Sequence, residues 1–139
     1  NMRFCDSLVD AFIEQVEGNM ALVLACTVIK AYEAKNLPIP IKKTYLSFSG
    51  EENKVEYFTD ENGKKMEKNN VTIRMSSFIP LGISPSSGQK LSELVALYIA
   101  NNNGHIDGFT VGETVYDSNV DAYRITTRIY FSEITEKTA

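Results

Sequence analysis

The chain has 139 residues, of which 43% are hydrophobic and 23% are charged. This length and balance predict a single globular domain over residues 1–139, with a core large enough to fold without disulfides or a structural metal. The net charge of −4 gives no reason to expect specific nucleic-acid binding, and no stretch is apolar over the length that a bilayer requires.

The first third of the chain predicts a helix and one ambiguous segment. Apolar residues recur at helical spacing over residues 4–16, and a Gly-Asn pair then ends that helix. Residues 20–34 fit either a helix or a buried strand. The Ala, Leu, Glu and Lys of their second half favour the helix. The prolines of "LPIP" at 37–40 end the segment.

The middle of the chain changes to the two-residue period of strands. Residues 43–48 and 54–58 are predicted to form a hairpin through the turn "GEEN". Residues 59–70 are polar and contain a glycine, which predicts an exposed loop or hairpin tip. Residues 71–79 alternate again as a strand, and Pro80 ends it.

A second helix and two final strands complete the predicted fold. Ser86 and Gln89 have the spacing of a capping box at the start of an amphipathic helix, and "NNNG" is a natural helix end. Alternation then predicts strands around residues 109–115 and 123–131. The expected class is α+β, a mostly antiparallel sheet of about five strands with helices packed on one face.

The stretch "YDSNVDAYRI" is a candidate calcium-binding loop. Asp117, Asn119 and Asp121 stand at alternate positions, as do the first three ligands of an EF-hand loop. Such a loop needs glycine at its sixth position and glutamate at its twelfth. Those positions are Ala122 and Arg128, so we predict a hairpin turn and no metal site.

No other pattern indicates catalysis. The only histidine, His105, follows the Asn-rich helix end, and the two cysteines, Cys5 and Cys26, are predicted to be buried free thiols. No nucleophile elbow, phosphate loop or metalloprotease motif is present. We therefore expect no enzyme activity and no cofactor. An unrelated ligand-binding α+β domain stays open as an alternative, which a deep pocket around His105 would favour.

One polar strand face is the candidate site. It combines arginines with a tyrosine among Thr and Ser: Arg74, Arg124, Arg128 and Tyr130. An ordinary solvated sheet face accounts for them, and so does a subunit interface, since Arg and Tyr are enriched in contacts between proteins.

Three segments together resemble a known family: "LPIPIKKTYLSFS", "VTIRMSSFIPLGISPSSGQKLSELVALYI" and "GETVYDSNVDAYRITTRIYFSEI". Over residues 37–134 their order is similar to that of small tail proteins of long-tailed bacteriophages and prophages of low-GC Gram-positive bacteria, of the tail terminator or tail-completion type. Those proteins close with a "GE(I/V)xYD…AxxxxxxxxF" hairpin, matched here by Gly112, Glu113, Tyr116, Asp117, Ala122 and Phe131.

The resemblance implies a structural protein without an active site. It implies a homo-oligomeric ring, typically a hexamer, that caps the tail tube and joins it to the head. Its partners would be tail tube and head-tail connector proteins, in the virion tail and, during assembly, in the host cytoplasm. The arginine face and the predicted loops 49–54 and 59–70 would lie at the contacts. Another connector or a tube subunit is the alternative within the same particle.

Overall fold

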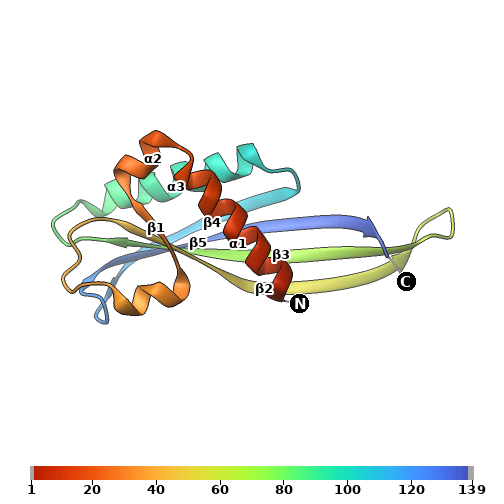
Figure 1. The fold of residues 1–139 in the computed structure, drawn as a ribbon, viewed down its shortest axis with the longest axis horizontal. Coiled ribbons are helices and arrows are strands. Elements are labelled where there is room, and N and C mark those ends of the chain that lie inside the picture. Colours follow the sequence, from red (N-terminus) through yellow and green to blue (C-terminus); the bar gives the residue numbers. More distant parts are fainter. Residues whose placement is uncertain (1, 138–139) are drawn as a thin grey trace.

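The computed structural model describes residues 2–137, which form three α-helices, one 3-10 helix (η1) and a five-stranded sheet (Figure 1). In chain order the elements are α1 (Met2–Glu17), α2 (Met20–Ala25), β1 (Thr27–Lys30), η1 (Ala31–Asn36), β2 (Tyr45–Thr59), β3 (Lys65–Ile79), α3 (Pro85–Asn102), β4 (Ile106–Asp117) and β5 (Ala122–Glu136). The strand order is β1-β2-β3-β5-β4. Only the β1–β2 pair is parallel, so the predicted α+β class with a mostly antiparallel sheet is confirmed.

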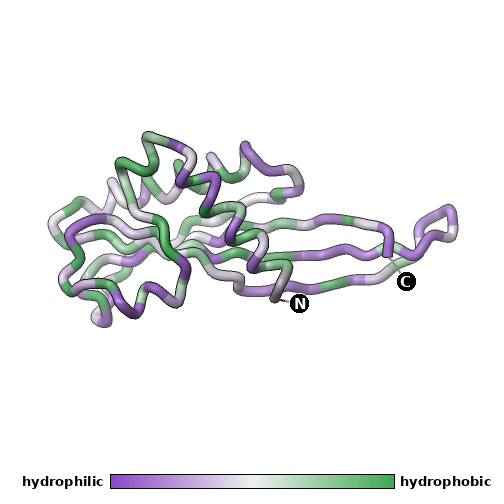
Figure 2. Tube along the Cα trace, viewed as in Figure 1, coloured by the Kyte–Doolittle hydropathy of each residue, from purple (hydrophilic) through white to green (hydrophobic). Residues whose placement is uncertain are grey.

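The main core lies between the sheet and the two long helices. Phe12 of α1 and Ile99 of α3 are completely buried, as are Ile73 of β3 and Ile129 of β5. Burying each such side chain contributes about 1.5–3 kcal/mol to folding. Hydrophobic residues concentrate under these helices, whereas hydrophilic residues predominate where the strands project beyond them (Figure 2). The helical stripe over residues 4–16 therefore packs as the sequence predicts.

A smaller apolar cluster lies on the other face of the sheet, at one end. Phe78 is buried there although its neighbour Ile79 points into the main core, because successive side chains of a strand alternate between faces. Ile41 and Leu37, which follow η1, pack against Phe78 together with Val120. The segment that contains η1 thus covers one end of the face that α1 and α3 leave open.

Residues 20–34 contain both of the structures that the sequence left open. The preferred helix is present as α2 and as the 3-10 helix η1, but it is wrong for Thr27–Lys30, which form β1. This short strand pairs in parallel with Tyr45–Phe48 of β2. Its hydrogen-bond partners are distant in sequence, so local composition could not identify it.

The predicted hairpin of residues 43–58 is wrong, because these residues form the single strand β2. Both of its halves pair with β3, and the segment "GEEN" holds a bulge between Gly50 and Glu52 instead of a turn. The true hairpin tip is shorter than the predicted loop of residues 59–70. It is a turn at residues 60–64, where Asp60 accepts hydrogen bonds from two backbone N–H groups and Gly63 has a φ of +79°.

The capping box predicted at the start of α3 is also wrong. The N-cap is Ser84, Pro85 is the first helical residue, and Ser86 forms a side-chain hydrogen bond of 2.8 Å with Ser84. Gln89 instead donates to the carbonyl of Gly112 in β4, at 3.1 Å. The predicted Asn-rich helix end is confirmed, since the Asn103 amide donates to the carbonyl of Ile99 at 2.7 Å.

Candidate functional site: protein-interaction surfaces

The sheet register brings the four predicted site residues onto one face. Arg74 of β3 lies directly opposite Arg128 of β5, and Tyr130 lies opposite Thr72. Arg124 is four residues before Arg128 and therefore shares its face. We call the side that carries these four residues the arginine face. It is the side of the sheet away from α1 and α3, because the residues between them, such as Ile73 and Ile129, are buried against those helices.

Glu51 joins the two arginines that stand opposite each other. Its carboxylate oxygens lie 2.7 Å from Nε of Arg128 and 3.7 Å from Nη1 of Arg74. The hydrogen bond from Arg128 is the main cause of a lowered pKa for Glu51, and the same contact raises the pKa of Arg128. Like charges directly across a ladder repel, so the bridging carboxylate is what makes this pair stable.

Glu51 was missed at the sequence level because it was placed in a solvated turn. The bulge after Gly50 moves it out of the regular alternation of β2 and directs it towards β3 and β5. The contact depends on the register that places Arg74 opposite Arg128 and on the bulge, so local sequence carried no signal for it.

The other two predicted residues contact β4 and its turn. Arg124 donates from Nε to the carboxylate of Asp117 at 3.1 Å, and Tyr130 shares a hydroxyl hydrogen bond of 3.2 Å with Thr110. The three arginine side chains are 37–44% exposed. Three guanidinium groups therefore face two carboxylates, and farther along the same face Tyr130 is bordered by Glu52, Lys54 and Asp107, so the face is solvent-accessible and of mixed charge.

The predicted turn in "YDSNVDAYRI" is confirmed, since β4 ends at Asp117 and β5 begins at Ala122. Asp117 accepts a hydrogen bond of 2.9 Å from the backbone N–H of Asn119, as turn aspartates do. Asp121 accepts one of 2.5 Å from the Tyr116 hydroxyl, which raises the pKa of that tyrosine. Within residues 2–137 no three His, Cys, Asp or Glu side chains are grouped as metal ligands.

The other candidate reactive groups have structural contacts. His105 adopts a φ of +68° in the turn before β4 and stacks edge-on against Phe131, with ring centroids 5.9 Å apart. Cys5 and Cys26 are buried free thiols, as predicted. Burial raises the pKa of both, that of Cys26 to about 11, which disfavours the nucleophilic thiolate.

Three strands continue beyond the N-terminal end of α1 as a projecting arm (Figure 1). We define the arm as residues 52–59 of β2, 65–70 of β3 and 132–136 of β5. It exposes large hydrophobic side chains: Tyr57 (62%), Phe58 (42%) and Ile134 (53%). The predicted contact loops 49–54 and 59–70 are therefore mostly strands, and the second of them belongs largely to this arm.

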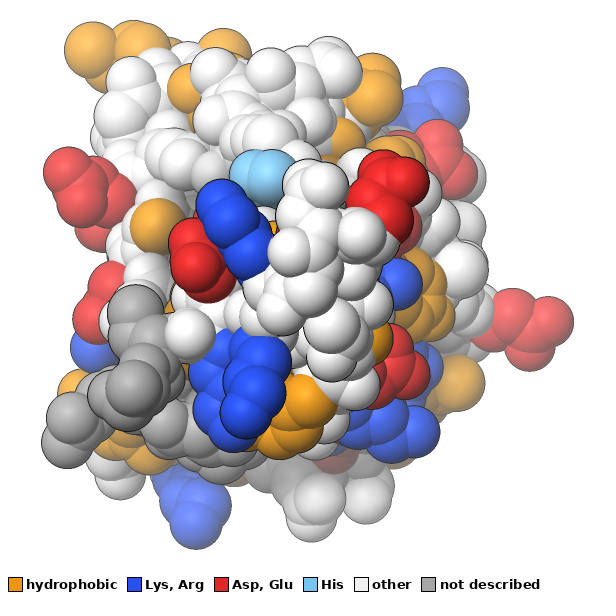
Figure 3. Space-filling view, turned by 90° about the vertical axis from the view of Figure 1, so that its right-hand side faces the viewer, with side chains coloured by type: hydrophobic (Ala, Val, Ile, Leu, Met, Phe, Trp, Pro, Cys, Tyr) orange, Lys and Arg blue, Asp and Glu red, His pale blue; other side chains and the backbone are white. Residues whose placement is uncertain are grey.

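Both edges of the arm are open. The strand β1 pairs with β2 only at Tyr45–Phe48, and β4 pairs with β5 no farther along than Phe131. The outer backbone groups of residues 54–59 and 133–136 consequently face no neighbouring strand, a state that favours pairing with another chain. Seen from the end at which the arm projects, basic side chains are interspersed with acidic ones (Figure 3), and those of the arm itself are Lys and Glu.

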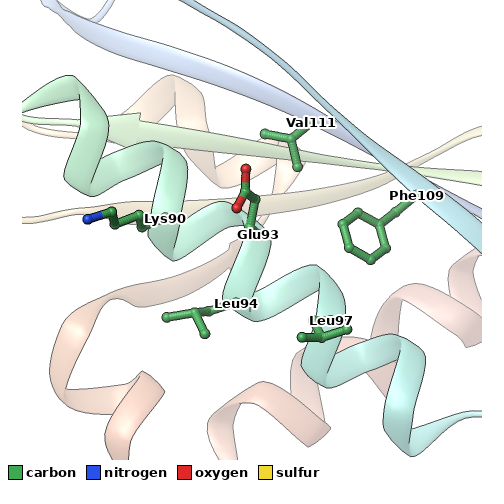
Figure 4. Close-up of a pocket in the computed structure, with 6 residues that line it drawn as sticks. All are labelled: Lys90, Glu93, Leu94, Leu97, Phe109 and Val111. Atoms are coloured by element: carbon green, nitrogen blue, oxygen red, sulfur yellow. The ribbon is translucent and has the colours of Figure 1, made fainter.

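An apolar groove of about 600 Å³ runs between α3 and the edge strand β4. Its lining residues are Lys90, Glu93, Leu94, Leu97, Phe109 and Val111. Glu93 points from α3 towards Val111, and Leu94 and Leu97 occupy successive turns of the helix (Figure 4). Leu94 is 59% and Leu97 49% exposed, so the wall of the groove formed by α3 is accessible from solvent.

A second groove of about 620 Å³ lies beside β1 and α1, where Lys30 and Asp10 form an ion pair of 2.8 Å. His105 lines neither groove. Neither groove is therefore the deep pocket around His105 that would have favoured a ligand-binding domain.

No protein-family model matches the sequence, and no curated protein matches it. Across the part of the chain that is described, no helix has the length and apolar character needed to cross a membrane.

Proposed function

We propose that the chain is a structural subunit of a long-tailed bacteriophage or prophage, of the tail terminator or tail-completion type. In this role copies of the chain form a ring, typically a hexamer, that caps the tail tube and joins it to the head. The order of segments over residues 37–134 supports the role through its resemblance to that family. No catalytic step belongs to the proposal.

The observation that carries the proposal is the projecting arm. A sheet that continues past its covering helices, with open edges and with Tyr57 exposed on one face and Phe58 and Ile134 on the other, presents two faces suited to contact with another protein. Backbone groups along the edges can pair with a partner strand, and the aromatic side chains supply the apolar contact area. We assign this arm to contact with the tail tube or the head-tail connector.

The arginine face supplies a second contact in the proposal. In such an assembly each subunit presents surfaces to its neighbours around the ring and further surfaces to tail or connector proteins. Arg124, Arg128 and Tyr130 are accessible hydrogen-bond donors on this face, and acceptor groups of a partner, carboxylates above all, complement them. The chain would reside in the virion tail, after assembly in the host cytoplasm.

The proposal requires a tail tube protein encoded in the same genome, and the test polymerises that tube protein in the presence and absence of the purified chain. A terminator is expected to bind tube ends and shorten the tubes as its concentration rises, as measured by electron microscopy. Unlimited tube growth with no bound chain would overturn the role. Incorporation of the chain along the tube would identify it as a tube subunit instead.

The arginine face is tested in the same assay with the double substitution Arg124→Glu and Arg128→Glu. We expect weaker capping, with the amount of chain needed to shorten tubes rising by about tenfold or more. Reversed charges would also repel Asp117 and Glu51, so the pair Arg124→Gln and Arg128→Gln is the milder variant, with circular dichroism to confirm folding. Unchanged capping by both folded variants would remove this face from the contact.

A further inference from the structure

One edge of the sheet carries an exposed apolar projection and the other edge carries an apolar groove. At the β1 edge, the short helix α2 holds the two most exposed large hydrophobic side chains of the described residues, Leu24 (82%) and Met20 (75%). At the β4 edge lies the apolar groove between α3 and β4. The strand order places β1 and β4 at opposite ends of the sheet, so one molecule presents both features on opposite sides.

The exposed residues of α2 are held outward by the packing of the same helix. Leu22 is buried in the main core, and Asn19 caps the first turn by accepting hydrogen bonds from Ala21 and Leu22 N–H groups at 3.1 and 3.2 Å. With Leu22 fixed inward, Met20 and Leu24 are presented to solvent on a short, anchored helix. They form an apolar projection without any charged residue in α2 itself.

The groove exists because α3, which contacts β4 through Gln89 at its start, leaves part of the edge strand uncovered. Phe109 and Val111 of β4 point to the helix-covered face, since their neighbour Thr110 lies opposite Arg128 on the arginine face. Phe109 and Val111 are nonetheless only partly buried. A further helix placed beside α3, above the β4 edge, would cover these two residues together with Leu94 and Leu97.

We propose that the groove between α3 and β4 receives α2 of a second copy of this chain. Among the described strands, β1 and β4 each have a neighbour on one side only. Placing β1 of one copy along β4 of the next would continue the sheet, and α2, which directly precedes β1, would then continue the helical layer over the groove. The contact is head-to-tail, the kind from which rings are built.

This inference rests on the proposed function, because it supplies the subunit contact of the proposed ring. A second copy of the chain is the partner because the apolar projection at the β1 edge complements the apolar groove at the β4 edge. The arginine face and the arm stay free for the tail tube and the connector.

The test is the mass of the full-length chain by light scattering over a wide concentration range. The wild type is expected to associate. Leu24→Glu, which alters the α2 projection, and Leu97→Glu, which alters the groove, are each expected to raise the dissociation constant by more than about tenfold. Both side chains are exposed, so circular dichroism should show an unchanged fold. Ile39→Glu, at a residue 61% exposed outside both surfaces, is the matched control.

Mixing the two variants identifies the geometry. A Leu24→Glu copy keeps an intact groove and a Leu97→Glu copy keeps an intact α2, so the mixture is expected to form dimers that cannot extend. A wild type that stays monomeric, full association of either variant, or a mixture without dimers would each overturn the contact. If the wild type associates through this contact but does not cap tubes, the contact is supported and the tail role is rejected. If the wild type caps tubes but Leu24→Glu associates as the wild type does, the tail role is supported and the contact is rejected.

Discussion

At the scale of single residues, the arginine face depends on one carboxylate. Glu51 lies between Arg74 and Arg128 and offsets the repulsion of two cations that the sheet register places opposite each other. The side chain of Glu51 is 28% exposed and the guanidinium groups are more exposed, so solvent screens the interaction. Its main consequence is the orientation of both arginines on the face proposed to bind a partner.

Replacing Glu51 by glutamine is expected to destabilise the chain by about 0.5–1 kcal/mol at neutral pH, because two guanidinium groups lose their shared partner. Arg128 lowers the pKa of Glu51 below its usual value of 4.5 in the folded state. The unfolded chain therefore binds that proton more tightly than the folded chain. The stabilisation is complete above pH 4.5 and disappears as the pH falls through the lowered pKa.

Urea unfolding of wild type and Glu51→Gln at a series of pH values checks this expectation. The difference in unfolding free energy should shrink as the solution is made acidic. Glu61→Gln, in the exposed turn at the tip of the arm, is the matched control and should show no such trend. A difference that stays constant down to low pH would contradict the role assigned to the carboxylate.

At the scale of the elements, α3 is held against the sheet at very short range. Gly88 faces Ile79 of β3, and a Cβ atom at this position would come within 2.7 Å of the Ile79 Cγ1 atom. One turn later, Ser92 forms a buried hydrogen bond of 2.8 Å with Ser77 of β3 and donates to the Gly88 carbonyl at 2.9 Å. A small residue and a satisfied hydroxyl pair together allow the helix to approach this closely.

Gly88→Ala is expected to destabilise the chain by about 1–3 kcal/mol, because the added methyl group must displace the fully buried Ile79. In an exposed helix the same change would stabilise by up to about 1 kcal/mol, so the sign of the effect reports the packing. Urea unfolding supplies the measurement. Gly82→Ala, where a Cβ meets no atom within 4 Å, is the control and should be close to neutral. A stabilised Gly88→Ala variant would contradict this account of the docking.

At the scale of the whole molecule, stability and binding are separated in space. The core lies under α1 and α3, whereas the arm projects from it with exposed side chains (Figure 1). Residues of the arm that contribute little burial can therefore be changed without loss of the fold. The arm is the part of the chain in which binding can be tested independently of folding.

The triple substitution Tyr57→Ser, Phe58→Ser and Ile134→Ser is expected to lower the free energy of unfolding by about 1–3 kcal/mol and to leave the chain folded, because the three side chains are 42–62% exposed. Binding to assembled tail tubes, measured by co-sedimentation, is expected to weaken by about tenfold or more. The substitution of Tyr32, a 68% exposed residue of η1, by serine is the control. Full tube binding by the triple variant would exclude the arm from the contact.

The sequence was informative wherever local periodicity and tertiary packing agree. The apolar stripe of α1, the alternation of β5 and the oxygen-rich turn at residues 117–122 each follow from spacing alone. Arg74, Arg124, Arg128 and Tyr130 share one sheet face, as their spacing predicts, because alternation along β3 and β5 fixes which side chains share a face. The class of fold follows from the same patterns.

What only the tertiary structure decided were the features with distant partners. The strand β1 forms because β2 offers it an edge, "GEEN" becomes a bulge because β3 pairs on both sides of it, and Glu51 meets its arginines through that bulge. The Gln89 side chain donates to the Gly112 carbonyl in β4 and does not cap the start of α3. Each of these is settled by backbone pairing or packing between residues far apart in the chain. Local spacing determines which face a side chain takes, and long-range pairing determines what it meets there.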